Sequence, residues 1–439
     1  MSSEEAPAPV TGRSTQAGES PPERWAWVER SIWTERMLEA LEKGVKGGVW
    51  FSLVDKVRRP STLAAAWERV RRNAGSAGAD GQSVKAFEAQ AEDHLKRLRE
   101  ELAEGRYRPS PVKRVWIAKP GSRQKRPLGV PTVRDRIVQT ALRLVIEPIF
   151  EREFAATSYG FRPGRGCKDA LRRVDELLRH GHVWVVDADL KGYFDSIPHD
   201  RLMDEVRKRI ADGRVLDLIE GYLRQGVLEE MKLWTPQTGT PQGAVISPLL
   251  ANVYLHPVDE AMRQAGHEMV RYADDFVVLC RNQEEAEEAL ATVRRLAEER
   301  GLTLHPDKTR ITHAGDGFDF LGYHFERGTR WPRDKSLMKL KDALRAKTPR
   351  ANGRSLECIF ADVNRTLRGW FAYFQHSHWT TFPPLDAWLR RRLRSIVRKR
   401  SKRRGISRGL DHQRWPNAYF RERGLFSLAE AHRSALRPS

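Results

Sequence analysis

The N-terminal part of the chain changes from a polar segment to a pattern of apolar residues at helical spacing. Residues 1–22 are rich in Ser, Glu, Pro and Ala and offer almost nothing to bury, so we expect them to be disordered. After them, apolar positions recur every three or four residues. The pattern predicts a helix over residues 62–72, with Ser61 as its N-cap, and a second helix over residues 84–102.

The middle of the chain holds short apolar segments that are typical of strands. Residues 112–119 alternate between apolar and polar, and residues 182–189 are rich in β-branched side chains. Two further short strands, 269–271 and 276–280, flank the sequence YADD, which indicates a β-hairpin with the two aspartates at its tip. We expect these segments to form a sheet.

Helical spacing returns in the last third of the chain. Residues 284–300 form a clear helical pattern that stops at Gly301. From residue 337 onward the pattern is helical throughout, with breaks expected at Gly353 and at the pair Pro383 and Pro384. The chain therefore combines a mixed α+β central part with a helical C-terminal part.

The charge of the chain predicts a polyanionic partner. It has 78 Lys and Arg residues against 58 Asp and Glu, a net charge of +20. Nucleic acid is the first candidate and an anionic membrane surface the second, but no apolar run reaches the ~18 residues of a membrane span. The 3 cysteines are widely separated, which excludes a disulfide framework. We expect a cytoplasmic protein that does not bind membranes.

Basic residues are concentrated at the C-terminal end. Residues 385–439 hold 16 Lys or Arg against 4 Asp or Glu, and residues 390–404 have enough apolar positions for an amphipathic helix. A solvated face or an unstructured tail would give the same composition. The interleaved aromatic residues favour nucleic-acid binding. Alternatively, this region packs on the preceding helices through Trp388, Leu425 and Phe426.

The two aspartates at the predicted hairpin tip need a cation, because adjacent carboxylates repel each other. Mg²⁺ favours carboxylate and phosphate oxygens. A third carboxylate on a neighbouring strand would complete a two-metal site for displacement at phosphorus. Asp187 and Asp189 project from the same face of the strand 182–189, and either could supply it. A simple solvent-exposed turn would also explain Asp274 and Asp275.

Eight motifs in order along the chain resemble those of group II intron-encoded reverse transcriptases, of the bacterial type without a C-terminal endonuclease domain. They are RPLGVPT (126–132), SYGFRPGR (158–165), VDADLKGYFD (186–195), TPQGAVISPLLAN (240–252), YADD (272–275), PDKT (306–309) with FLG (320–322), and the maturase-like LRGWFAYF (367–374). The zinc-dependent endonuclease common in this family needs paired cysteines, and none follows Cys358. We therefore do not expect target-strand nicking.

The resemblance assigns the chemistry of the site. It makes Asp189, Asp274 and Asp275 the catalytic carboxylates that hold two Mg²⁺ ions, with Mn²⁺ able to substitute, and adds the backbone carbonyl of Leu190 as a metal ligand. Lys308 aligns with the lysine that protonates the leaving pyrophosphate, although a surface lysine would fit the same position. The role of Asp187 remains open.

The resemblance also assigns substrate contacts. The incoming nucleotide is expected to contact Lys119, Arg126, Phe194 and Gln242. Arg123 or Lys125 could replace Arg126, and Phe194, the expected steric gate against ribose, could instead be core packing, with Tyr193 the next candidate. Nucleic-acid contacts are expected from Arg162, Arg165, Arg368, Trp370, Arg390, Arg394, Arg398 and Lys402.

The implied architecture is a right-hand polymerase with fingers, palm, a helical thumb and a basic helical C-terminal region. We expect the following divisions: an N-terminal helical extension (23–59), fingers and palm (60–330), a thumb that is also the maturase domain (331–384), and a DNA-binding region (385–439). The implied partners are intron RNA, target DNA and deoxynucleoside triphosphates. The implied location is the bacterial cytoplasm, at the nucleoid when the protein is on DNA.

The resemblance implies a protein that assists splicing of its intron RNA and copies it at a DNA target by target-primed reverse transcription. Two alternatives stay open. A polymerase of this lineage could serve another task, such as phage defence or spacer acquisition from RNA. A splicing factor could also have lost polymerisation, which the intact aspartates argue against. The sequence leaves the choice between monomer and homodimer undecided.

Overall fold

The computed structural model describes most of the chain, namely residues 24–118, 125–229, 232–240, 242–351, 353–403 and 409–435. The predicted disordered segment 1–22 lies outside the described residues. Among the helices of the described ranges, none has the length and apolar character needed to cross a membrane.

The N-terminal helices pack onto the central part of the molecule. They are α2 (Glu35–Lys43), α3 (Val54–Val57), α4 (Pro60–Asn73), α5 (Val84–Glu88) and α6 (Ala91–Glu104). Trp33 is fully buried, and its Nε1 donates a hydrogen bond to the carbonyl of Leu144 on α7 (Val133–Glu151), at 3.0 Å. The extension therefore shares the largest hydrophobic core of the protein.

Two of the predicted N-terminal helices differ from expectation in their details. The first begins at Pro60 rather than after Ser61, because proline suits the first turn, where a backbone N–H needs no partner. The predicted helix over residues 84–102 is divided into α5 and α6, because Gln90 leaves the helical conformation (φ −134°, ψ 34°).

The fingers region contains a four-stranded sheet in the order β2-β1-β4-β5. Its strands are β1 (Val112–Ala118), β2 (Lys125–Val130), β4 (Val227–Glu229) and β5 (Lys232–Trp234). β1 and β2 are antiparallel, with Ile117 opposite Arg126. The predicted strand 112–119 is thus confirmed as far as Ala118.

The central sheet is antiparallel and has the order β6-β7-β3-β8. It consists of β3 (Trp184–Asp189), β6 (Glu268–Tyr272), β7 (Asp275–Cys280) and β8 (Arg310–His313). Alternate residues of β7 face two cores: Phe276 and Val278 join the main core, while Val277 and Leu279 join a second core that includes α8 (Cys167–Arg179). Both faces are buried, which explains why β7 reads as a continuous apolar run.

Helices and a small sheet complete the palm region. The remaining elements are α9 (Tyr193–Ser196), α10 (His199–Arg207), α11 (Gly213–Leu223), α12 (Ser247–Gln264), α13 (Gln283–Glu299), β9 (Phe318–Phe320), β10 (Tyr323–Glu326) and β11 (Thr329–Pro332). α13 matches the predicted helix 284–300 within one residue at each end. Its cap is Asn282, whose side chain accepts a hydrogen bond from the backbone N–H of Glu285 at 2.8 Å.

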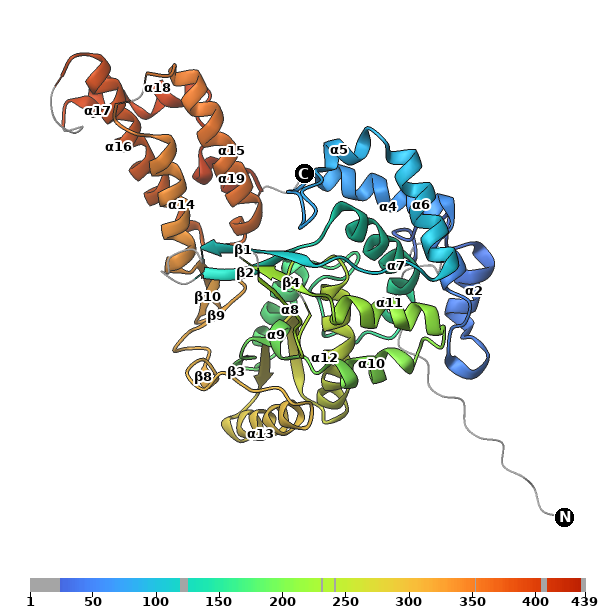
Figure 1. Cartoon of the computed structure of the whole chain (residues 1–439). Coiled ribbons are helices and arrows are strands. Elements are labelled where there is room, and N and C mark those ends of the chain that lie inside the picture. The colour runs from blue at the N-terminus through green and yellow to red at the C-terminus, as the bar shows by residue number, and fades with distance from the viewer. Residues whose placement is uncertain are drawn as a thin grey trace.

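The C-terminal helices form a separate bundle that projects from the palm (Figure 1). They are α14 (Asp334–Lys347), α15 (Leu356–Phe374), α16 (Phe382–Arg400), α17 (Asp411–Arg414), α18 (Asn417–Glu422) and α19 (Leu428–Ala435). One hydrophobic core joins them, from Leu340 on α14 to Leu428 on α19. We call this bundle, residues 334–435 as far as described, the thumb.

The predicted boundary between residues 384 and 385 is therefore wrong, because it falls in the first turn of α16. Pro383 and Pro384 do not break the helix; they occupy its start, where they are tolerated. The predicted basic helix 390–404 begins earlier, at Phe382, and ends at Arg400. Leu425 is buried in the thumb core, and Trp388 and Phe426 pack against it, so the packing alternative for this region is confirmed.

Candidate active site

The strand pairing brings the three predicted aspartates together at the end of the central sheet. β3 and β7 are antiparallel with Asp189 directly opposite Asp275. Residues opposite each other in such a pair have Cα atoms about 4.5–5.5 Å apart. Asp274 lies in the two-residue turn between β6 and β7, so the hairpin predicted from the YADD sequence is confirmed. Residues far apart in the sequence thus share one site.

The electrostatics of this site favour a cation. Burial, together with the negative charges of Asp187, Asp274 and Asp189, raises the pKa of Asp275 to about 7. Burial and Asp189 likewise raise the pKa of Asp274. The carboxylates resist ionisation together, which is the behaviour of a donor set that accommodates divalent cations.

Two cationic side chains act electrostatically on the aspartates. Lys308 donates a hydrogen bond from Nζ to Asp189 Oδ2 at 2.6 Å. Arg126 is exposed on β2, and its positive charge counteracts the raised pKa of Asp274. Both residues were predicted to belong to the site; the fold places Lys308 in contact with Asp189, and the charge of Arg126 acts on Asp274. Lys119, the other predicted triphosphate contact, lies outside the described residues.

Asp187 has a partner of its own. Its Oδ2 lies 3.6 Å from Nε of Arg310 on β8, which neighbours β3 in the sheet. Burial raises the pKa of Asp187 to about 6, while Arg310 opposes the shift. The strand register distinguishes the two residues, because Asp189 lies opposite Asp275 whereas Asp187 lies opposite Val277. The sequence carried no sign of this difference, since Arg310 is remote along the chain.

The structure does not present a ready-made metal cage. Within the residues that it describes, no three or more His, Cys, Asp or Glu side chains converge as metal ligands do. The backbone around Asp189 is nevertheless fixed: its carbonyl accepts a hydrogen bond from the N–H of His305 at 2.7 Å, and the side chain of Leu190 is buried. The metal roles of the aspartates and of the Leu190 carbonyl remain predictions.

A loop holds Phe194 and Gln242 near the fingers. The N–H of Thr240 donates to the carbonyl of Phe194, and the N–H of Gly129 on β2 donates to the carbonyl of Gln242, both at 2.7 Å. A Cβ atom on Gly243 (φ +104°) would lie 2.6 Å from the carbonyl oxygen of Gly129, so this approach requires glycine. Phe194 is half-buried beside Tyr193. Their nucleotide contacts remain predictions.

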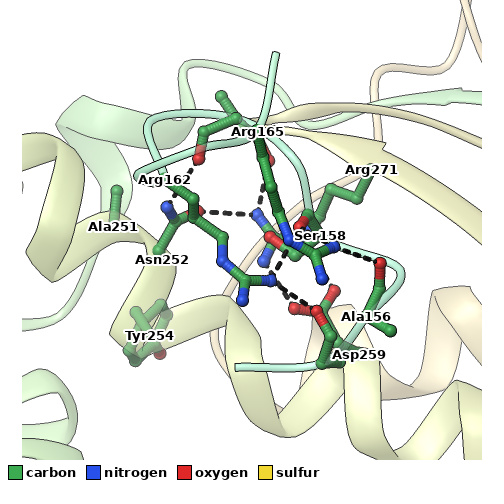
Figure 2. Close-up of polar contacts among 12 residues, drawn as sticks. Ala156, Ser158, Arg162, Arg165, Ala251, Asn252, Tyr254, Asp259 and Arg271 are labelled. Carbon is green, nitrogen blue, oxygen red and sulfur yellow. Dashed lines mark hydrogen bonds and ion pairs between the residues drawn. The ribbon is translucent and has the colours of Figure 1, made fainter. Parts of the chain in front are cut away.

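Behind the hairpin lies a buried network that the sequence did not reveal (Figure 2). Arg271 on β6 is 1% exposed and donates two hydrogen bonds to the carboxylate of Asp259 on α12, at 2.6 and 2.5 Å. Its Nη1 also donates to the Asn252 side chain at 3.0 Å and to the Ala273 carbonyl at 2.8 Å. The sequence contained one sign of this network, namely the charged Arg271 beside the apolar residues of β6.

This network supports the backbone of the hairpin tip. Ala273 has a φ of 61°, in the left-handed region that costs a non-glycine residue energy. Arg271 donates a hydrogen bond to the carbonyl of Ala273. Gly160 packs so closely that a Cβ there would lie 2.3 Å from the N of Ala273, and Asn252 donates to the carbonyl of Gly160 at 2.8 Å. The position of Asp274 therefore depends on buried contacts that do not themselves touch the site's opening.

The prediction that Arg162 contacts the template is wrong. Arg162 is 6% exposed, and its guanidinium forms an ion pair with Glu151 at 2.5 Å and donates to the carbonyl of Ala155. It also donates to the carbonyl of Ser158, which lies beside it in Figure 2. Most of its N–H groups are used inside the protein, and its burial keeps the guanidinium away from a template phosphate. Arg165 is half-buried and donates to the carbonyl of Ala156 at 2.7 Å. Its template contact remains a prediction.

The prediction for Arg394 is also wrong. This residue is 2% exposed and donates to the carbonyl of Trp415 and to the side chain of Asn417, each at 2.8 Å. Arg398 is half-buried and donates two hydrogen bonds to Asp411, at 3.0 and 2.8 Å. Both side chains bind α16 to the segment that follows it, through the carbonyl of Trp415, the side chain of Asn417 and the carboxylate of Asp411.

The other predicted thumb contacts differ in exposure. Arg368 and Lys402 are exposed, and Arg390 is half-buried, 4.0 Å from Asp386. Trp370 packs on Phe374 with ring centroids 4.8 Å apart, so much of its surface serves the thumb core. The nucleic-acid contacts of these four residues remain predictions.

Two protein-family models match the chain. Residues 117–325 match "Reverse transcriptase (RNA-dependent DNA polymerase)", and residues 337–415 match "Group II intron, maturase-specific domain". The first match covers the central sheet and the three aspartates. The second covers α14, α15 and α16 and extends past the expected boundary at residue 384, in agreement with the continuous thumb core.

Individual curated proteins and a solved structure are similar to parts of the chain. The chain is 35% identical over 342 residues to protein YkfC of Escherichia coli, covering 69% of this chain and 86% of that protein. It is 36% identical over 234 residues to the group II intron-encoded protein LtrA of Lactococcus lactis, covering 53% of this chain and 39% of LtrA. Among solved structures, a chain of the partial Cas6-RT-Cas1–Cas2 complex is 25% identical, covers 56% of this chain and 41% of that chain, and gives a TM-score of 0.37.

Proposed function

Because the chain belongs to the reverse transcriptases that carry a group II intron maturase domain, and is an RNA-directed DNA polymerase with a right-hand fold, we propose that it assists splicing of its intron RNA and copies that RNA at a DNA target. The observation that carries this proposal is the presence of the polymerase site and the maturase domain in one chain. The thumb is continuous with the maturase domain, so the same helices can contact RNA during splicing and during copying.

The proposed metal ligands are Asp189, Asp274, Asp275 and the carbonyl of Leu190, holding two Mg²⁺ ions. The donor set fits, since Asp189 and Asp275 lie on paired strands with Asp274 in the adjoining turn, and carboxylates are hard oxygen donors. Burial and the neighbouring carboxylates raise the pKa of Asp274 and of Asp275. When bound, the ions supply Lewis acidity at the transferring phosphoryl group and lower the pKa of the primer 3′-hydroxyl. Mn²⁺ would satisfy the same ligands.

The chain's own cations are proposed to act on the triphosphate. Arg126 lies near enough to Asp274 to influence its pKa and is exposed, so its guanidinium can bind two phosphate oxygens at once. Lys308 holds its ammonium at Asp189, from which it can deliver a proton to the leaving pyrophosphate. The contact of Lys308 with Asp189 and the charge effect of Arg126 on Asp274 support these two roles.

Two further side chains are proposed to select the nucleotide. Phe194 lies just after β3 and is held by the loop of Thr240, so its ring can exclude a ribose 2′-hydroxyl. Gln242 is fastened to the fingers strand β2 and can line the nucleotide pocket. Target DNA binding is proposed for the exposed basic side chains of the thumb, which carries much of the positive charge of the chain.

The test is a primer-extension assay with Mg²⁺ and a preannealed RNA template. Asp275→Ala should abolish cDNA synthesis, because the metals lose an anionic ligand, and binding to RNA should persist, since it rests on other surfaces. Asp217→Ala is the matched control: it removes an exposed carboxylate from α11 and should leave synthesis unchanged. Extension by the Asp275→Ala protein at near-normal rate would overturn the site assignment.

The splicing part of the proposal has its own test. Intron RNA from the DNA that flanks the coding region would be incubated with the protein at the Mg²⁺ concentration where the RNA alone splices slowly. Faster splicing with the wild-type protein and with Asp275→Ala supports a maturase role that is independent of polymerisation. Absence of a group II intron from the flanking DNA would contradict it.

A further inference from the structure

The thumb contains a cavity that neither the polymerase site nor the family matches assign. Its volume is about 280 Å³, and it is lined by Thr348, Arg350, Trp388, Arg391, Arg392 and Ser395. Thr348 closes the C-terminal end of α14, while four of the lining residues come from α16. The cavity therefore lies between the end of one helix and the outer face of another.

The periodicity of α16 explains why these residues face outward together. Leu389, Leu393 and Ile396 point into the thumb core, and Arg394 is buried beside them. Residues 388, 391, 392 and 395 recur at helical spacing on a different face. Arg394 and Arg398 of α16 thus hold the thumb together, whereas Arg391 and Arg392 line the cavity.

The lining is cationic. It holds three arginines and no Asp or Glu. Asp386, the acidic residue of α16, faces elsewhere, because its carboxylate accepts hydrogen bonds from the backbone N–H groups of Leu428 and Ala429. Within the described part of the chain, Arg391 forms no ion pair with an Asp or Glu side chain. The guanidinium of Arg391 is therefore available to an anion in the cavity.

One arginine of the cavity is held in place. Arg392 donates from Nε to Oγ1 of Thr348 and from Nη2 to the carbonyl of Thr348, both at 3.0 Å. The two bonds orient its guanidinium and anchor α16 to the end of α14. A preoriented guanidinium recognises the oxygens of a phosphate at a lower entropic cost than a freely rotating one.

An aromatic ring lies beside the cationic groups. Trp388 is half-buried, with the guanidinium of Arg392 at 5.5 Å and that of Arg345 at 5.6 Å from its ring centroid. Planar guanidinium groups and an indole ring are surfaces on which nucleic-acid bases stack. The hydroxyl of Ser395 adds a hydrogen-bonding group at the wall. Phosphate recognition and base stacking are thus available within one cavity.

The size of the cavity limits its ligand. Pockets for complete small molecules occupy roughly 300–1,000 Å³. A cavity of about 280 Å³ is at the lower edge of that range, which suits one unit of a polymer whose neighbouring units run over the surface. We infer that this cavity binds one nucleotide of single-stranded RNA, with its phosphate on Arg391 and Arg350 and its base against Trp388. The inference rests on the proposed function, whose RNA partner it locates on the thumb.

The experiment measures the affinity of the full-length protein for a fluorescein-labelled single-stranded oligouridylate of roughly 16 nucleotides, by anisotropy over a range of salt concentrations. The test variants are Trp388→Leu and the double variant Arg350→Gln/Arg391→Gln. The matched control is Arg365→Gln/Arg433→Gln, which removes the same charge from exposed positions on α15 and α19. Thermal unfolding verifies that each variant is folded.

The double variant should weaken binding and reduce the slope of log affinity against log salt by about 0.7, because the two arginines share one phosphate and each phosphate neutralised on a single strand contributes roughly 0.7. Trp388→Leu should weaken binding at least about fivefold with little change in slope, since stacking is not ionic. Equal losses in the control would overturn the inference, as they would reflect net charge alone. If the cavity variants bind the oligouridylate as tightly as the wild-type protein does, the inference about the cavity is overturned, while the proposed function still stands.

Competition identifies the source of the phosphate. Uridine monophosphate and inorganic phosphate are added to the wild-type complex as competitors. Displacement of the oligouridylate only at millimolar competitor, and equally for the control variant, agrees with a polymer site. Displacement at micromolar inorganic phosphate would overturn it, because the cavity would then be a site for free anions.

Discussion

Replacing Arg271 by Met would separate the two roles of the buried network behind the catalytic hairpin. The substitution removes the guanidinium but keeps an unbranched side chain of similar length. Asp259 then stays at 0% exposure without its partner, and the carbonyl of Ala273 loses the donor at 2.8 Å. The first change affects stability, and the second affects the position of Asp274.

The magnitude of the stability loss follows from burial. Breaking a buried ion pair by removing one partner costs about 3–5 kcal/mol, because the remaining charge is uncompensated. That is a large part of the ~5–15 kcal/mol by which a typical protein is stable. We expect the free energy of unfolding of Arg271→Met to fall by an amount in this range.

A second substitution should restore stability without restoring catalysis. In Arg271→Met/Asp259→Leu both charges are replaced by apolar groups, which is often neutral for stability. The Ala273 carbonyl still lacks its donor, at a residual cost of about 1–3 kcal/mol. The left-handed Ala273 is then less firmly held, and a displacement of Asp274 by about 1 Å would lower kcat roughly 100-fold. KM for the nucleotide should change little.

The measurements are denaturant unfolding and single-turnover primer extension, normalised to folded protein. Arg300→Met is the control: it breaks the ion pair with Glu205, 3.1 Å long and remote in sequence from the hairpin, and should reduce stability while leaving kcat unchanged. If the double variant regains both stability and wild-type kcat, Arg271 is only a structural residue, and the reasoning from the Ala273 carbonyl is refuted.

Three further predictions concern other parts of the site and the thumb. Phe194→Val should raise ribonucleotide incorporation relative to deoxyribonucleotide, measured as the ratio of the two efficiencies; an unchanged ratio would assign Phe194 to packing. Lys308→Gln should slow nucleotide incorporation about 10²-fold or more in single-turnover assays, because the leaving pyrophosphate is no longer protonated, while nucleotide affinity changes little. Incorporation at the wild-type rate would show that Lys308 has no catalytic role. A protein ending at Pro384 should lose the thumb's unfolding transition in calorimetry, because the truncation removes Leu389, Leu393 and Ile396 from its core. Retention of that transition would show that the remaining helices fold alone.

The sequence determined the elements of this protein and the identity of its main catalytic candidates. Period-2 and period-3.6 patterns depend on local geometry, so β1, β3, β6, β7 and α13 were predicted within one or two residues. Asp274 and Asp275 are adjacent in the chain, and a two-residue turn places them at a tip whatever the rest of the molecule does. The order of the motifs then identified the family.

Only the tertiary structure decided what each charged residue does. The register between β3 and β7 places Asp189, and not Asp187, opposite Asp275. Arg162 and Arg394 were expected to contact nucleic acid, which requires exposed guanidinium groups. Carbonyls and carboxylates from other segments satisfy both guanidinium groups inside the protein, and Asp259 does the same for Arg271. A pattern along the chain records which residues are charged, whereas burial depends on partners that the fold brings from distant positions.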